Sequence, residues 1–93
     1  MLFRSAGFSE PKFSMKVDEF LELYAAGERN FAKVNLRSAE LTQLRLQEVN
    51  FSGADLRQAR LGKTNLVRAN LSNADLSEAI LWGTDLSEAD LSN

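Results

Sequence analysis

The chain has 93 residues and contains neither cysteine nor histidine. It therefore has no thiolate nucleophile, no imidazole base, no zinc site of the usual nitrogen and sulfur ligands, and no disulfide. These absences exclude cysteine-histidine enzymes, Ser-His-Asp hydrolases and metal-thiolate enzymes. We expect a protein that is not an enzyme, with no catalytic residue, no metal, no cofactor and no small-molecule substrate.

Long hydrophobic runs are also missing. No window approaches the roughly 18 apolar residues that cross a bilayer, and the first residues break before a signal-type core forms. Eleven basic and thirteen acidic residues give a formal net charge of −2, which is too even to indicate nucleic acid or a membrane surface. We expect a cytoplasmic protein with no membrane span and no nucleic-acid partner.

A repeat of five residues fills most of the chain. Leucine or phenylalanine occupies the series Leu36, Leu41, Leu46, Phe51, Leu56, Leu61, Leu66, Leu71, Leu76, Leu81, Leu86 and Leu91. A small or apolar residue stands two positions before each, usually with Asn or Asp between. A period of five fits neither one face of a helix nor one face of a flat strand, so the chain must turn once per repeat.

A second similarity at twenty residues indicates how many turns close one coil. Residues 50–56 recur as residues 70–76, and residues 64–66 recur as residues 84–86. Four repeats per coil is the simplest explanation, and it predicts a square solenoid whose coils stack at about the 4.8 Å spacing of a sheet.

The Ala-(Asn/Asp)-Leu-x-x pattern of residues 34–93 resembles the pentapeptide-repeat family. The resemblance implies an all-β solenoid, a right-handed quadrilateral β-helix of about three coils of four repeats. The structural core would be the series from Leu36 to Leu81. Residues 18–31 and 79–83 are similar to a cyanobacterial subgroup that includes a longer protein of heterocyst differentiation, which implies regulatory protein contacts.

The segment before the repeats predicts a short amphipathic helix. Val17, Phe20, Leu21 and Tyr24 have the i, i+3, i+4, i+7 spacing of one helical face, and Gly27 is a natural stop. We divide the chain into a poorly ordered leader at 1–14, a helix at 15–28 capping the open end of the solenoid, and the β-helix at 29–93. Either Met1 or Met15 could be the natural start.

The last repeat is complete, and the sequence shows no segment after it that would cover the end of the solenoid. An open solenoid end leaves backbone groups and leucines exposed. Two interpretations stay open. In the first, Leu86, Asp90 and Leu91 of the C-terminal coil make an end-to-end contact with another chain or with a second copy. In the second, the chain is a fragment of a longer solenoid.

One outer face carries a candidate protein contact. Trp82 and Ile80 fall at outward positions of the same face as Arg60 and Lys63, and an exposed tryptophan beside an isoleucine is typical of a contact anchor. The alternative is that Trp82 lies flat over neighbouring glycines and covers backbone.

The predicted faces also bring polar residues together. Asp55 and Asp75 would lie one coil apart, where they could share a proton or act as an acid and a base, although Arg37 and Arg57 are near enough to neutralise them. Asparagines that stand at the same position in successive coils predict a stacked amide ladder. Residues 34–70 hold six basic residues against three acidic ones, whereas residues 71–93 hold five acidic residues and no basic one.

These observations favour a non-enzymatic protein-protein interaction or scaffold module. An alternative follows from the family resemblance, because some members mimic DNA and bind a type II topoisomerase, gyrase. Those mimics are long acidic rods, whereas the first two coils here are predicted to be basic.

Overall fold

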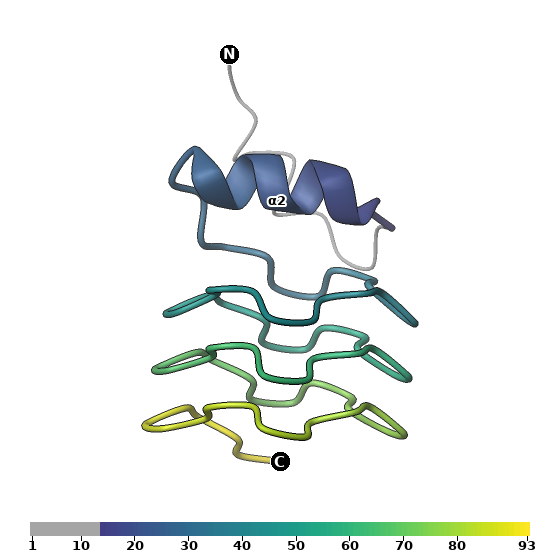
Figure 1. Cartoon of the computed structure of the whole chain (residues 1–93), viewed down its shortest axis with the longest axis vertical. Helices are drawn as coiled ribbons and strands as arrows, with labels where there is room; N and C mark the ends of the chain where they lie inside the picture. Colours follow the sequence, from purple (N-terminus) through teal and green to yellow (C-terminus); the bar gives the residue numbers. More distant parts are fainter. Residues whose placement is uncertain (1–13) are drawn as a thin grey trace.

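The computed structural model describes residues 14–93 (Figure 1). Within this range the one helix is α2 (Val17–Ala25), and after it the chain winds in stacked coils. Figure 1 shows α2 lying across one end of the stack, with the C-terminus at the opposite end. The leader predicted over 1–14 lies outside the described residues except for Ser14, which forms a parallel bridge with Asn35.

Strand pairing is made entirely of single parallel bridges in the described part of the chain. Apart from the Ser14 bridge, each joins residues twenty positions apart, so four repeats make one coil. The bridges are Asn30 with Asn50, Asn35 with Asp55, Glu40 with Arg60, Arg45 with Asn65, Asn50 with Asn70, Asp55 with Asp75, Arg60 with Ile80, Asn65 with Asp85, and Asn70 with Asp90.

Three main-chain hydrogen bonds per repeat join one coil to the next. In one repeat, Leu56 N donates to Asp75 O at 2.9 Å and Gln58 N donates to Ser77 O at 2.9 Å. In return, Asp75 N donates to Ala54 O at 2.9 Å. The same pattern recurs on every side of the solenoid, which satisfies backbone groups that would be costly to bury unpaired.

A tight turn separates successive repeats. Ala59 N donates to Leu56 O at 3.1 Å across such a turn, and its third residue, Gln58, has φ 62°. A positive φ at this position is typical of a type II turn. The residues in this conformation are Lys33, Ser38, Gln43, Glu48, Gly53, Gln58, Lys63, Arg68, Asn73, Glu78, Gly83, Glu88 and Asn93.

The repeated leucines fill the interior of the coils. The predicted core residues Leu36, Leu41, Leu46, Phe51, Leu56, Leu61, Leu66 and Leu71 are all buried, whereas Leu76 and Leu81 are only partly buried and pack against that core. Thr64 is the one buried polar residue among those described, and its hydroxyl donates to Leu41 O. The interior therefore becomes more open toward the C-terminal coil.

Phe20 joins α2 to the solenoid. Its side chain is fully buried, with its ring centroid 4.6 Å from that of Phe31 and 5.6 Å from that of Phe51. Tyr24, one turn further along α2, donates its hydroxyl proton to Gln47 O at 2.8 Å. The helix is shorter than the predicted 15–28, because Gly27 adopts φ 107° just after it ends.

Two glycines in repeats separated by one other repeat test the turn geometry. We expect Gly53→Ala to lower the free energy of unfolding by about 1 kcal/mol, because its φ is 67° and the new Cβ would lie 3.2 Å from Lys33 Cγ. The matched control is Gly62→Ala, whose φ is not positive and whose Cβ would meet Trp82 O at an ordinary 3.5 Å. It should be neutral or stabilising by up to about 1 kcal/mol. Urea unfolding measures both, and equal losses would contradict the turn assignment.

Candidate interaction surfaces

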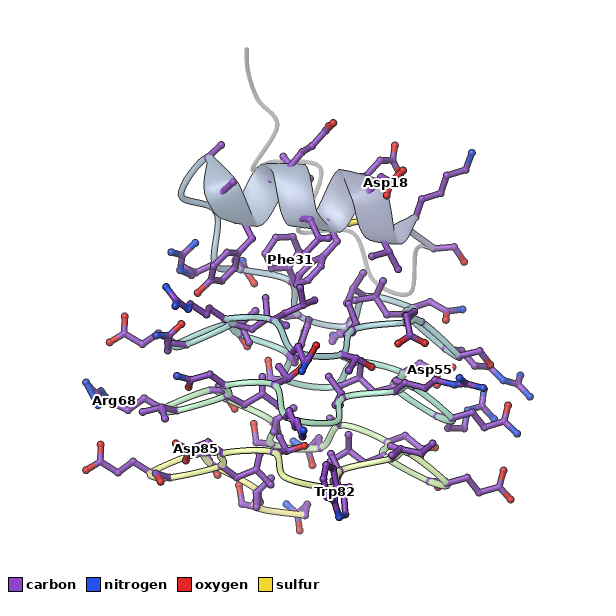
Figure 2. All side chains as sticks on the ribbon, in the orientation of Figure 1. Asp18, Phe31, Asp55, Arg68, Trp82 and Asp85 are labelled. Carbon is purple, nitrogen blue, oxygen red and sulfur yellow. The ribbon has the colours of Figure 1, made fainter. Side chains whose placement is uncertain are left out.

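The large exposed hydrophobic side chains of the described residues all lie in the last coil. Trp82 is 70% exposed, and Ile80 and Leu91 are each 50% exposed. Figure 2 shows Trp82 at the C-terminal end of the stack, far from α2. Trp82 and Ile80 lie two residues apart in one repeat, and adjoining exposed apolar side chains mark contact sites more often than scattered ones, so the face that carries them is the candidate interaction surface.

Trp82 presents its ring to solvent. The atom of Trp82 nearest a Cβ built on Gly62 is the carbonyl oxygen, at 3.5 Å, and that oxygen accepts a hydrogen bond from Lys63 N at 2.8 Å. Lys63 Nζ lies 5.0 Å from the ring centroid, a cation-π distance. The main chain of Trp82, rather than its ring, lies beside Gly62.

The other predicted contact residues of this face lie in adjacent coils. Arg60 forms the parallel bridge with Ile80, and its side chain pairs with Glu40 in the preceding coil, Nε to Oε1 3.8 Å. The structure thus brings Ile80 and Arg60 side by side, and brings Lys63 onto Trp82. Both side chains of the Arg60–Glu40 pair are more than 60% exposed, so this pair contributes little to stability.

The residues predicted for an end-to-end contact differ in exposure. Leu91 is half exposed, whereas Leu86 is partly buried against the core. Asp90 is engaged within its own turn, since its Oδ1 accepts from Ser92 N at 3.0 Å and from Ser92 Oγ at 2.7 Å.

The Asn or Asp position has a role that the sequence analysis missed. Its side-chain Oδ1 accepts a hydrogen bond from the backbone N–H two residues later, at 2.9 to 3.2 Å, which is an Asx turn. The residues that do so are Asn30, Asn35, Asn50, Asp55, Asn65, Asn70, Asp75, Asp85 and Asp90. The Ser that often follows two positions after Asp or Asn was the available signal.

The predicted amide ladder is present at one step. Asn50 Nδ2 donates to Asn30 Oδ1 at 3.3 Å, while Asn70 Oδ1 accepts from Ser72 N at 3.0 Å and from Ser72 Oγ at 2.7 Å. These side chains therefore serve mainly to hold the turns, and the contact between amides is secondary.

Arg57 neutralises the two stacked aspartates. Its Nη2 lies 2.8 Å from Asp55 Oδ2, and its Nε lies 3.9 Å from Asp75 Oδ2. The Arg57 hydrogen bond lowers the pKa of Asp55 below its usual value. The Ser77 hydroxyl and backbone N–H, followed by the charge of Arg57, lower the pKa of Asp75. Both carboxylates are held ionised, so neither is prepared to donate a proton as a general acid.

Basic side chains of the middle coil pair with acids in the coils on either side. Arg68 is the clearest case, with its Nε 3.6 Å from Glu48 Oε2 and its Nη1 3.2 Å from Glu88 Oε1. Arg57 also reaches Asp75 of the last coil. The predicted excess of positive charge in the first two coils is thus partly compensated by cross-coil pairs.

Metal and membrane sites are not seen in this part of the chain. Residues 14–93 contain no group of three or more acidic side chains placed to hold a metal ion. Among the helices that the structure describes, none has the length and apolar character needed to cross a membrane.

The twenty-residue coil, the five-residue repeat and the turn between repeats together define a class of protein. The sequence model of pentapeptide repeats matches residues 30–66 and 54–93, with eight copies, and the chain belongs to the pentapeptide-repeat family. The predicted resemblance is confirmed, and with it a β-helical solenoid of the right-handed kind that the family forms.

A particular relative among solved structures is HetL, a pentapeptide repeat protein involved in heterocyst differentiation regulation from the cyanobacterium Nostoc sp. strain PCC 7120. The two are 59% identical with a TM-score of 0.83, over 84% of this chain and 33% of HetL. This chain therefore spans about a third of the length of HetL. Another pentapeptide repeat protein from Nostoc PCC 7120 is 30% identical over 88% of this chain and 79% of its own, with a TM-score of 0.43. A comparison with curated proteins gives no match.

The Asx turns predict how stability depends on pH. Hydrogen bonds from Ser87 lower the pKa of Asp85, and those from Ser77 and Ser92 lower the pKa values of Asp75 and Asp90. Because the folded pKa values lie below the unfolded ones, this stabilisation is present above about pH 4 and is lost as the pH falls further. We expect the melting temperature to fall below pH 4.

The combined variant Asp75→Asn, Asp85→Asn and Asp90→Asn isolates this contribution. Asparagine keeps the oxygen that accepts the hydrogen bond from the backbone N–H, but it does not titrate. The melting temperature of the variant should therefore fall less between pH 6 and pH 3 than that of the original chain. Thermal unfolding followed by circular dichroism measures the difference. An acid-induced loss of the same size in both proteins would show that these turns do not couple to pH.

Proposed function

We propose that this chain is a non-enzymatic, cytoplasmic protein-interaction module whose last coil binds a regulatory protein partner. The contact would be made by Trp82 and Ile80, with Lys63 and Arg60 beside them. The observation that carries the proposal is the exposure of Trp82 and Ile80 within one repeat of that coil. Tryptophan and arginine are enriched among interface anchors.

The relative and the chemistry of the surface support a binding role over a catalytic one. HetL is involved in the regulation of heterocyst differentiation, and we extend a regulatory role of this kind to the present chain. The stacked carboxylates Asp55 and Asp75, which could resemble an acid-base pair, are held ionised by Arg57 and Ser77. A regular outer wall suits recognition of a folded partner, because it is rigid before contact and loses little entropy on binding.

We propose that α2 acts as the N-terminal cap of a quadrilateral β-helix. Solenoids need their end coils covered, since an open end exposes the apolar interior. The contact of Phe20 with Phe31 and Phe51 supports this role, as does the hydrogen bond from Tyr24 to Gln47 O. In this scheme residues 15–28 form the cap and residues 29–93 form the β-helix that presents the contact surface.

Replacing Trp82 tests the proposed contact. Chromatography of a cyanobacterial lysate over the immobilised chain would identify the partner, and titration with the purified partner would give the affinity. We expect Trp82→Ala to weaken binding at least tenfold, because truncation of a central tryptophan usually costs about 2 kcal/mol or more. The control is Thr42→Ala, because Thr42 is exposed and stands two coils earlier at the position that Trp82 has in its own coil. Equal affinity of the Trp82 variant and the original chain would contradict the proposal.

Mimicry of DNA is the competing function, and the acidic C-terminal coil is the feature that favours it. A DNA mimic needs a long series of negative charges, since DNA carries one per about 1.7 Å of its axis. Here Arg57, Arg60 and Arg68 interrupt the acidic side chains. We therefore expect gyrase to supercoil relaxed plasmid normally in the presence of this protein. Inhibition at micromolar concentrations would reverse the order of the two functions.

A further inference from the structure

One side of the solenoid combines exposed apolar side chains with an excess of positive charge. We call it the tryptophan face, and it consists of residues 39–43, 59–63 and 79–83, which follow one another in successive coils. It carries two basic residues, Arg60 and Lys63, against one acidic residue, Glu40. The other three sides, each with one acidic residue more than basic ones, are residues 34–38 with 54–58 and 74–78, residues 44–48 with 64–68 and 84–88, and residues 49–53 with 69–73 and 89–93. The tryptophan face is therefore the positive side of the repeat region.

The exposure of this face follows from its outward positions. Ile80 stands below Arg60 in the coil stack, and the side chain of Arg60 is still 65% exposed although it has a coil on either side. Trp82 has the same position in its repeat as Thr42, which is also exposed in the first coil. Outward side chains on this side are thus open to solvent in every coil, and Ile80 and Trp82 put apolar surface there.

Lys63 keeps its charge available beside the tryptophan ring. Its Nζ lies 5.0 Å from the centroid of the Trp82 ring, and within residues 14–93 it forms no ion pair with a carboxylate. A cation over an exposed ring gains little from the ring alone, whereas an ammonium and a carboxylate form a strong, short hydrogen bond. A carboxylate placed beside Trp82 would therefore gain an ion pair without displacing one.

Arg60 also has donors to spare. Its Nε lies 3.8 Å from Glu40 Oε1, and the other oxygen of that carboxylate accepts a hydrogen bond from Thr42 Oγ1 at 2.6 Å. In the described part of the chain, no residue accepts a hydrogen bond from the two terminal nitrogens of Arg60. A guanidinium can bind a carboxylate at these two nitrogens, next to Ile80, while its Nε stays near Glu40.

We propose that the tryptophan face binds an acidic segment of a partner protein, in which Asp or Glu side chains stand next to a large apolar side chain. The apolar side chain covers Trp82 and Ile80, and the carboxylates pair with Lys63 and Arg60. A long polyanion such as DNA fits less well, because the other three sides of the solenoid are acidic and would repel it. The inference rests on the proposed function, since it names the chemistry of the partner at the same surface.

The experiment selects ligands for the immobilised full chain from random peptides of about twelve residues displayed on phage. The affinity of each selected peptide, made with a fluorescent label, is then measured by anisotropy. Trp82→Ala removes the apolar anchor. The double variant Arg60→Glu, Lys63→Glu reverses the charge of the face, and Lys33→Glu, Arg45→Glu makes the same change of charge away from it.

The two double variants are matched by position in the repeat. Lys33 and Lys63 both have a positive φ, 64° and 58°, and Glu48 shows that glutamate is accommodated at this place in the turn. Arg45 and Arg60 both stand directly before a buried leucine. Circular dichroism checks that each variant keeps the fold, so a loss of affinity reports on the surface.

We expect the peptides that lose binding with Trp82→Ala to contain more Asp and Glu than Lys and Arg. They should bind the Arg60→Glu, Lys63→Glu variant at least about tenfold more weakly and the control variant within about twofold. About 0.5 M NaCl should also weaken their binding to the original chain.

Three results would contradict the inference in different ways. Peptides that depend on Trp82 but are neutral or basic, or that bind the charge-reversed face equally well, would overturn the acidic partner and leave the Trp82 contact in place. Displacement of the peptides by single-stranded DNA of equal length would make a polyanion the ligand instead. If no selected peptide depends on Trp82, the proposed contact itself fails, and the inference fails with it.

Discussion

The rest of the structure depends on the main-chain hydrogen bonds between coils. The three main-chain bonds that each repeat makes to the next coil must all find their partners, so every repeat has to keep the same length and the same turn. This constraint fixes the five-residue period. It also places nine residues other than glycine and asparagine, such as Gln58 and Arg68, at positive φ, where an L-residue is usually disfavoured.

The Asx turns and the buried leucines both contribute to holding that geometry. An Asn or Asp side chain bonds the N–H two residues later and so fixes the entrance to the turn, while the neighbouring Leu or Phe anchors the repeat inside. The two requirements fall on adjacent positions, as in Asp55 and Leu56. This explains why a repeat with a leucine every fifth residue also carries Asn or Asp just before it.

The sequence was sufficient to predict the turn once per repeat and the leucine interior, because both follow from a strict period. It was also sufficient to place Trp82 and Ile80 on the outside. The Ser two positions after many of the Asn and Asp residues is a signal for the Asx turns, but the turns themselves depend on a side-chain oxygen reaching its own backbone. The amide ladder predicted from the asparagines is present at one step, Asn50 to Asn30. The sequence could not show that Lys63 approaches the Trp82 ring, because that contact depends on the rotamers of two long side chains in different coils.

The two ends of the solenoid differ in which apolar side chains are covered. Phe20 of α2 lies against Phe31 and Phe51 at one end, whereas Trp82 and Ile80 are exposed on an outer face toward the other. The proposed interaction is therefore placed on the face that carries Trp82 and Ile80. The middle coil, with its paired arginines, connects the two ends.

The most direct test of this account is the detection by NMR of scalar couplings across hydrogen bonds in the isotopically labelled chain. The account predicts couplings from Leu56 N to the carbonyl carbon of Asp75, from Leu61 N to that of Ile80, and from Leu66 N to that of Asp85. Coupling of these three amides to carbonyl carbons of other residues, or the absence of any coupling from them, would contradict the twenty-residue coil.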